Sequence, residues 1–212
     1  MTRACLLLSA VCCMVQGEII DRIAISVGNQ VITEGQIDEE IRLTDFLDHE
    51  KLNLDVAERK KAASRLIEQA LVKRDLELSR YPLPSSTDAD ASLHDVKISY
   101  SPESLYQQKL QEYQLDEDAL KRRLLWQLTL LRFIDYRFRP GIQIPDADIN
   151  AYYDQELDKW KQQGIQPIPT LEDSRAKIED ILTERRIDQA LDAWMGETRK
   201  QVTINYLDEK LK

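Results

Sequence analysis

The segment from residue 19 to residue 37, IIDRIAISVGNQVITEGQI, constrains the fold of this chain more than any other. Its first half holds apolar residues that nearly alternate, as in a half-buried strand: Ile19, Ile23, Ile25 and Val27. Gly28-Asn29-Gln30 interrupts the pattern with residues that tolerate a hairpin turn, and the pattern resumes at Val31-Ile32. Thr33 and Gln36 have the spacing of a capping box. The segment therefore predicts a strand, a tight turn, a second strand and a capped helix.

The first 17 residues have the composition of a secretory signal peptide. Arg3 supplies a positive charge, and the apolar stretch from Ala4 to Val15 is too short to span a bilayer. The small residues that precede Glu18 suit cleavage at that point. A buried N-terminal helix is the alternative interpretation.

All three cysteines, Cys5, Cys12 and Cys13, lie inside this leader. A mature chain beginning at Glu18 would therefore form no disulfide and no thiolate metal site. A lipoprotein signal is the other interpretation of these cysteines. The residues before Cys12 and Cys13 do not favour it, because they are not the small residue that such a signal requires.

The charge balance opposes two classes of partner. The chain has 29 Lys and Arg residues against 38 Asp and Glu residues, a net charge of -9. Such an acidic protein has no general affinity for nucleic acid or for anionic lipid surfaces. No stretch after the leader is long and apolar enough for stable membrane insertion.

Most of the remaining sequence predicts helices, because it has only 6 Gly and 7 Pro and is rich in good helix formers. We expect helices at 37–47, 56–79, 88–96, from 103 onwards, 116–139, 146–161 and 171–200, and a strand at 202–207. An isolated hairpin is marginally stable in water, so we expect the strand at 202–207 to pair with the N-terminal hairpin. The expected fold class is mainly α with a small antiparallel β element (α+β).

Two of the expected helices have unusual apolar patterns. The helix at 116–139 has one apolar face formed by Leu120, Leu124, Leu128, Leu131 and Phe138. A second face lies about a third of a turn away and holds Trp126, Leu130 and Phe133. Such a wide arc fits a central buried helix, or a helix with one face in the core and another facing a ligand. In the helix at 171–200 the apolar stripe changes sides near the middle, so we expect its two halves to contact different elements.

Three stretches resemble the SurA family of periplasmic chaperones, which is related to the parvulin-type peptidyl-prolyl isomerases. They are Asp21-Arg22-Ile23-Ala24 through Thr33 and Ile37, then 63–79 with 87–96 and 116–139, and Ala193-Trp194-Met195 through Val202-Thr203-Ile204. In the family these positions form a hairpin that leads into a helix, a helical domain, and a C-terminal helix with a closing strand. The resemblance implies a periplasmic protein that binds unfolded polypeptides without ATP, with outer-membrane β-barrel precursors as clients.

The chain departs from that family at one point. Family members usually carry one or two parvulin domains of about a hundred residues before the C-terminal helix. Here the residues from Arg139 to Leu157 resemble the approach to such a domain, and Leu171 resembles the exit from it. Only Asp158 to Thr170 lies between them, which is too short for an isomerase domain. We therefore expect a helical chaperone domain at 18–161, a linker at 162–170 in place of the insert, and a C-terminal helix and strand at 171–212 that pack on the first domain.

The residues offer little catalytic chemistry. His49 and His94 are the only histidines, and both lie in polar surroundings. The sequence contains no zinc-protease, nucleophile-elbow or nucleotide-binding motif. The acidic runs at 38–40 and 117–118 fit solvated helix faces. We therefore predict no catalytic residue, no metal site and no cofactor.

Two surface features remain open. The cations Lys121, Arg122, Arg123, Arg132, Arg137 and Arg139 form either ion pairs within the domain or a docking surface. For a chaperone, the candidate client-binding residues are Trp126, Leu130, Phe133, Tyr136, Tyr153 and Trp160. The alternatives to a chaperone are an adaptor that binds one specific partner and, less favoured, a peptidyl-prolyl isomerase.

Overall fold

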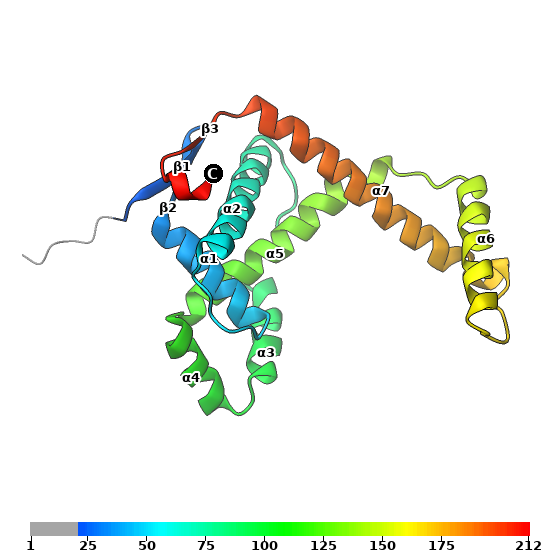
Figure 1. Ribbon diagram of the computed structural model, residues 1–212, viewed down its shortest axis with the longest axis horizontal. Coiled ribbons are helices and arrows are strands. Elements are labelled where there is room, and N and C mark those ends of the chain that lie inside the picture. Colours follow the sequence, from blue (N-terminus) through cyan, green and yellow to red (C-terminus); the bar gives the residue numbers. More distant parts are fainter. Residues whose placement is uncertain (1–20) are drawn as a thin grey trace, which may run out of the picture.

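The computed structural model describes residues 21–212 and confirms the expected fold class (Figure 1). The expected signal peptide and its three cysteines lie outside the described residues. The strands are β1 (Ile23–Val27), β2 (Gln30–Thr33) and β3 (Ile204–Tyr206). The helices are α1 (Glu34–Leu47), α2 (Val56–Leu78), α3 (Asp88–Ser99), α4 (Glu103–Tyr113), α5 (Glu117–Arg137), α6 (Asp146–Gln162) and α7 (Leu171–Gln201). Two short 3₁₀ helices follow α5 and β3, namely η1 (Arg139–Gly141) and η2 (Glu209–Leu211).

The N-terminal hairpin forms as its sequence predicts. Gly28 has a φ of 58°, the left-handed conformation that a tight hairpin turn requires. Thr33 and Gln36 form the expected capping box at the start of α1, each side chain accepting a hydrogen bond from the other residue's backbone N–H. The hairpin therefore leads directly into α1 with a fixed direction.

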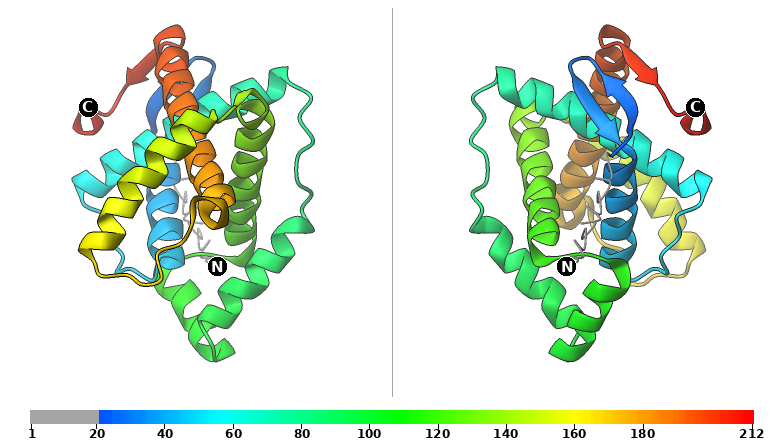
Figure 2. Two further views of the ribbon diagram at one scale, coloured as in Figure 1. Left: turned by 90° about the vertical axis from the view of Figure 1, so that its right-hand side faces the viewer. Right: turned by 90° about the vertical axis from the view of Figure 1, so that its left-hand side faces the viewer.

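The two ends of the described chain meet in one antiparallel sheet, in the order β2-β1-β3. Ile25 pairs with Tyr206 and Val27 with Ile204, which confirms the predicted pairing of the hairpin with the C-terminal strand. Figure 2 shows β3 beside the hairpin in both views. Beyond β3, η2 folds back onto α2 and buries Leu211 in the same core cluster as Ile25. Both termini therefore contribute to one core.

A second core cluster joins α1 to α3, α4 and the start of α5. Phe46 lies at its centre and stacks on Tyr100, with ring centroids 4.6 Å apart. The Tyr100 hydroxyl donates a hydrogen bond to the backbone oxygen of Phe46. Burial raises the pKa of Tyr100 to about 12, because the phenolate would lose its hydration.

The helix α7 contacts different elements with its two halves, as predicted. Its first half packs against α6, and in Figure 1 this pair extends away from the sheet. Its second half packs against α2 and places Trp194 against Phe133 of α5, with centroids 5.3 Å apart. Helix α6 therefore packs against α7. The domain boundaries expected from the sequence placed residues 146–161 with the N-terminal helices, in the domain at 18–161.

Candidate functional site

The six candidate client-binding residues do not form a single surface. Trp126 and Leu130 are half-buried side by side in one cleft, and Tyr136 is 49% exposed near the end of α5. Tyr153 and Trp160 lie on α6 and pack edge to face, with centroids 6.0 Å apart. They belong to the extended α6–α7 pair.

Phe133 corrects the sequence prediction, because it is fully buried. Its ring lies between aromatic side chains of three segments: Tyr81, Phe138 and Trp194. The side of α5 that we expected to face a ligand is covered at this level by α7. A bound polypeptide could not contact Phe133 in this fold, so its role is to hold α7 on α5. In contrast, Leu131, which belongs to the other apolar face predicted for this helix, is 60% exposed.

Trp126 and Leu130 line a cleft of about 350 Å³ between α2, α5 and α7, which we call the α2–α5 cleft. The other apolar residues that line it are Val72, Leu191 and Met195. Charged and amide side chains surround them, namely Arg65, Glu68, Gln69, Arg123 and Gln127. This arrangement can accept an apolar side chain while the rim stays hydrated.

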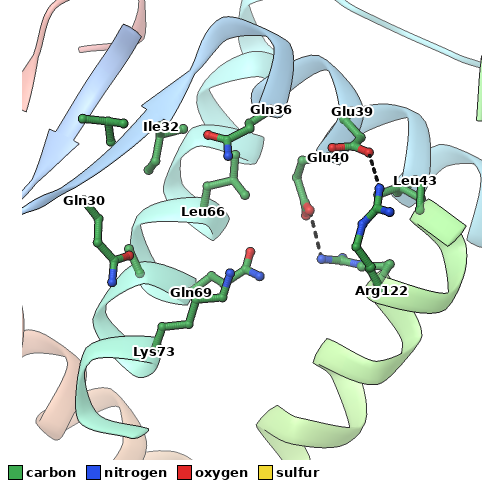
Figure 3. Close-up of a pocket in the computed structure, with 14 residues that line it drawn as sticks. Gln30, Ile32, Gln36, Glu39, Glu40, Leu43, Leu66, Gln69, Lys73 and Arg122 are labelled. Atoms are coloured by element: carbon green, nitrogen blue, oxygen red, sulfur yellow. Dashed lines mark hydrogen bonds and ion pairs between the residues drawn. The ribbon is translucent and has the colours of Figure 1, made fainter. Parts of the chain in front are cut away.

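A second cleft of about 340 Å³ lies beside β2 and is enclosed by α1, α2 and α5 (Figure 3). We call it the β2 cleft. It is lined by three consecutive residues of β2, Gln30, Val31 and Ile32, together with helical residues that include Gln69 and Lys73 of α2. Gln69 and Arg123 line both clefts, so the two adjoin. Sequence analysis missed the β2 cleft, since four separate elements form it and no local motif marks it.

A carboxylate with two arginine partners lines the β2 cleft. Glu40 is 5% exposed, and its two oxygens accept hydrogen bonds from Arg65 at 2.9 Å and Arg123 at 3.0 Å. Because a buried charge is unfavourable without partners, these two pairs fix the relative positions of α1, α2 and α5. Arg122 and Glu39, 3.5 Å apart, form a more exposed pair at the rim of the β2 cleft.

Lys73 differs from these cations. Among residues 21–212 no carboxylate lies within 4.0 Å of its ammonium group. The ammonium lies 5.3 Å from the centre of the Trp126 ring, close enough for a cation–π interaction. Desolvation lowers the pKa of Lys73, because no neighbouring carboxylate offsets the loss of water.

The basic cluster forms ion pairs within the domain, as one of the two interpretations predicted. Lys121 pairs with Asp90, Arg137 with Asp75, and Arg139 with both Asp135 and Glu184, at distances of 2.5 to 3.0 Å. For Arg132 no ion pair is found in the part of the chain that the structure describes. Most of the cluster therefore joins neighbouring helices.

Trp160 borders a third, separate cleft of about 350 Å³ between α6 and α7, lined also by Tyr152, Pro169, Ile178 and Ile181. The Tyr153 hydroxyl donates a hydrogen bond of 2.8 Å to the backbone oxygen of Pro169 and so holds the connecting loop against α6. This cleft shares no lining residue with the other two.

Within the described residues, no group of three or more His, Cys, Asp or Glu side chains is placed to hold a metal ion. None of the described helices combines the length and the apolar character needed to cross a bilayer. No protein-family model matches the chain, and no curated protein matches its sequence.

Proposed function

We propose that this protein is an ATP-independent periplasmic chaperone that holds unfolded polypeptides, with outer-membrane protein precursors as its clients. The observation that carries the proposal is the α2–α5 cleft, in which Trp126, Leu130 and Met195 offer an apolar floor inside a charged rim. A holdase needs such a surface, because it must accept many apolar side chains weakly and remain soluble itself. The resemblance of the motifs to the SurA family supports the compartment and the clients.

The connection between α6 and α7 supports a chaperone without isomerase activity. In the SurA-like arrangement a parvulin domain would stand at this position. Here residues 163–170 join the two helices by a short loop, held in part by Tyr153. We therefore expect no acceleration of prolyl isomerisation in a short peptide, and measurable acceleration would contradict this part of the proposal.

The test is suppression of aggregation. The mature protein should delay the light scattering of a urea-unfolded outer-membrane β-barrel protein after dilution, without nucleotide. Replacing both Trp126 and Leu130 by alanine should weaken this suppression several-fold, because both side chains line the α2–α5 cleft.

A matched control is available on the same helix. Leu131 is 60% exposed and does not line the cleft, so Leu131→Ala should leave suppression unchanged. Circular dichroism melts must show that the Trp126 and Leu130 variant stays folded. Unaltered suppression by that variant would refute the assignment of the cleft. Capture of a single stoichiometric folded partner, with no effect on unfolded proteins, would favour the adaptor instead.

A further inference from the structure

The outer edge of β2 is a free strand edge within the described sheet. The order β2-β1-β3 places β1 in the middle, so β2 has a neighbour on one side only. The direction of each backbone group follows from β1. Ala24 accepts a hydrogen bond from Leu207, and Gly28, directly after β1, donates one to Thr203. Ala24 and Ser26 of β1 therefore direct their backbone groups toward the C-terminal segment.

Ile25 and Val27 consequently direct their backbone groups toward β2, where they pair with Ile32 and Gln30. Val31 lies between these two residues of β2. Since backbone groups alternate along an antiparallel strand, the N–H and C=O of Val31 point away from β1. The Val31 side chain is also 51% exposed. The free edge thus presents one donor, one acceptor and an accessible apolar side chain.

The β2 cleft opens on this same edge. Side chains of successive residues in a strand point to opposite faces of the sheet. Gln30, Val31 and Ile32 all line the β2 cleft, so the cleft cannot lie on one face only. It must also reach the edge of the strand. In Figure 3 the side chains of Gln30 and Ile32 lie on the β2 side of the cleft, next to Gln69 and Lys73 of α2, and Arg122 lies on the opposite side. A chain lying along β2 would therefore place its side chains in the cleft.

The charge of the cleft indicates which side chains it favours. Three cations line it, Lys73, Arg122 and Arg123, against the two carboxylates of Glu39 and Glu40. Both carboxylates are already paired with arginines, which leaves Lys73 without an acidic partner among residues 21–212. This local positive excess occurs in a chain with a net charge of -9, so it complements an acidic ligand.

We propose that an extended segment of an unfolded polypeptide adds to the free edge of β2 through the backbone of Val31, and that an Asp or Glu of that segment lies beside Lys73. This inference rests on the proposed chaperone function and names how its client is recognised. Backbone pairing is independent of sequence, which suits a protein with many clients. Because β2 has only four residues, the pairing is short and the binding weak and reversible.

Amide hydrogen exchange provides the decisive test. The probe is a ten-residue peptide of alternating Thr and Tyr with one Asp, labelled with fluorescein. The Val31 amide should exchange rapidly in the free protein and become protected at saturating peptide. Binding of the peptide without protection at Val31 would overturn strand addition.

Substitutions at Val31 provide a second test. Val31→Pro removes a donor that faces away from β1, so the hairpin keeps its own hydrogen bonds, and proline is tolerated at such an edge. It should weaken peptide binding about fivefold, the loss expected for one hydrogen bond. Val31→Ala keeps the N–H and should change the affinity by less than about twofold, because its shorter side chain still leaves the strand edge open. Equal effects of the two variants would contradict backbone pairing; if Val31→Pro does not fold, hydrogen exchange decides.

The acidic contact is tested with a second peptide in which Asn replaces Asp. Lys73→Gln should weaken binding of the Asp peptide about threefold and leave the Asn peptide unchanged, as for an exposed ion pair. Equal effects on both peptides would refute the contact with Lys73. The two proposals can fail separately. If the wild-type protein suppresses aggregation but the Val31 amide stays unprotected, strand addition is overturned and the chaperone function is not. If the protein does not suppress aggregation at all, the chaperone function is overturned as well.

Discussion

Replacing Leu211 by alanine should destabilise the whole domain, although this residue is next to the last of the chain. Leu211 is 5% exposed and belongs to the core cluster that contains Ile25 and Ala62. A buried Leu→Ala change costs about 2 to 5 kcal/mol, since it loses buried apolar surface and leaves a cavity. The end of the chain can relax around the gap, so we expect about 3 kcal/mol. That is a large share of the roughly 5 to 15 kcal/mol that stabilises a typical domain.

Leu207→Ala is the matched control, because Leu207 is 60% exposed and lies four positions earlier. It should change the free energy of unfolding by less than about 0.5 kcal/mol. Urea unfolding followed by circular dichroism and by tryptophan fluorescence measures both variants. With a urea dependence of about 2.5 kcal/mol per molar, Leu211→Ala should lower the midpoint by about 1.2 M. Equal midpoints for the two variants would refute the idea that the C-terminus closes the core.

Three further predictions concern the interior. Phe133→Ala should lower the free energy of unfolding by about 4 kcal/mol in urea titrations, because it empties a fully buried aromatic site. Leu131→Ala should have almost no effect, and similar values for the two variants would contradict the burial of Phe133. Glu40→Gln should lower the free energy of unfolding by about 3 kcal/mol in the same assay, since it leaves two arginines without their shared carboxylate. A decrease of less than about 1 kcal/mol would show that the two ion pairs contribute little to stability. The raised pKa of Tyr100 means that the folded state holds this proton more tightly than the unfolded state. Its contribution to stability should therefore be fully present below pH 10 and be lost as the pH rises from 10 to about 12, by up to about 2 kcal/mol. Tyr100→Phe should reduce this pH dependence in urea titrations at successive pH values, and an unchanged slope would contradict the shift.

The local parts of the fold could be predicted from the sequence because their signals lie within a few residues. The turn at Gly28 and the capping box of Thr33 and Gln36 are examples. The pairing of the two termini could also be predicted, since a two-stranded hairpin needs a third strand and only one other segment alternates. The end of α3 was predicted less well, at Val96 instead of Ser99, because the stop signal at Pro102 marks the end of a helix only to within a few residues.

The candidate site was predicted only in part. Helical spacing correctly placed Trp126, Leu130 and Phe133 near one side of α5, but periodicity does not show which element covers each part of that side. The aromatic cluster around Trp194, more than 50 residues later in the sequence, decides that Phe133 is buried and Trp126 is not. The β2 cleft could not be predicted for the same reason, since its walls come from elements far apart in the sequence.

The pairing of β1 with β3 also determines when the fold can be completed. Ser26 and Asn205, joined by a side-chain hydrogen bond across this pair, are 179 residues apart. Because the chain is made from its N-terminus, the edge of β1 that faces β3 has no partner until almost all of the chain is present. During that time the apolar residues later covered by Leu211 stay exposed to solvent. The docking of residues 203–212 should therefore be the last step in the formation of this domain, and any chain that ends before β3 should remain open to proteolysis.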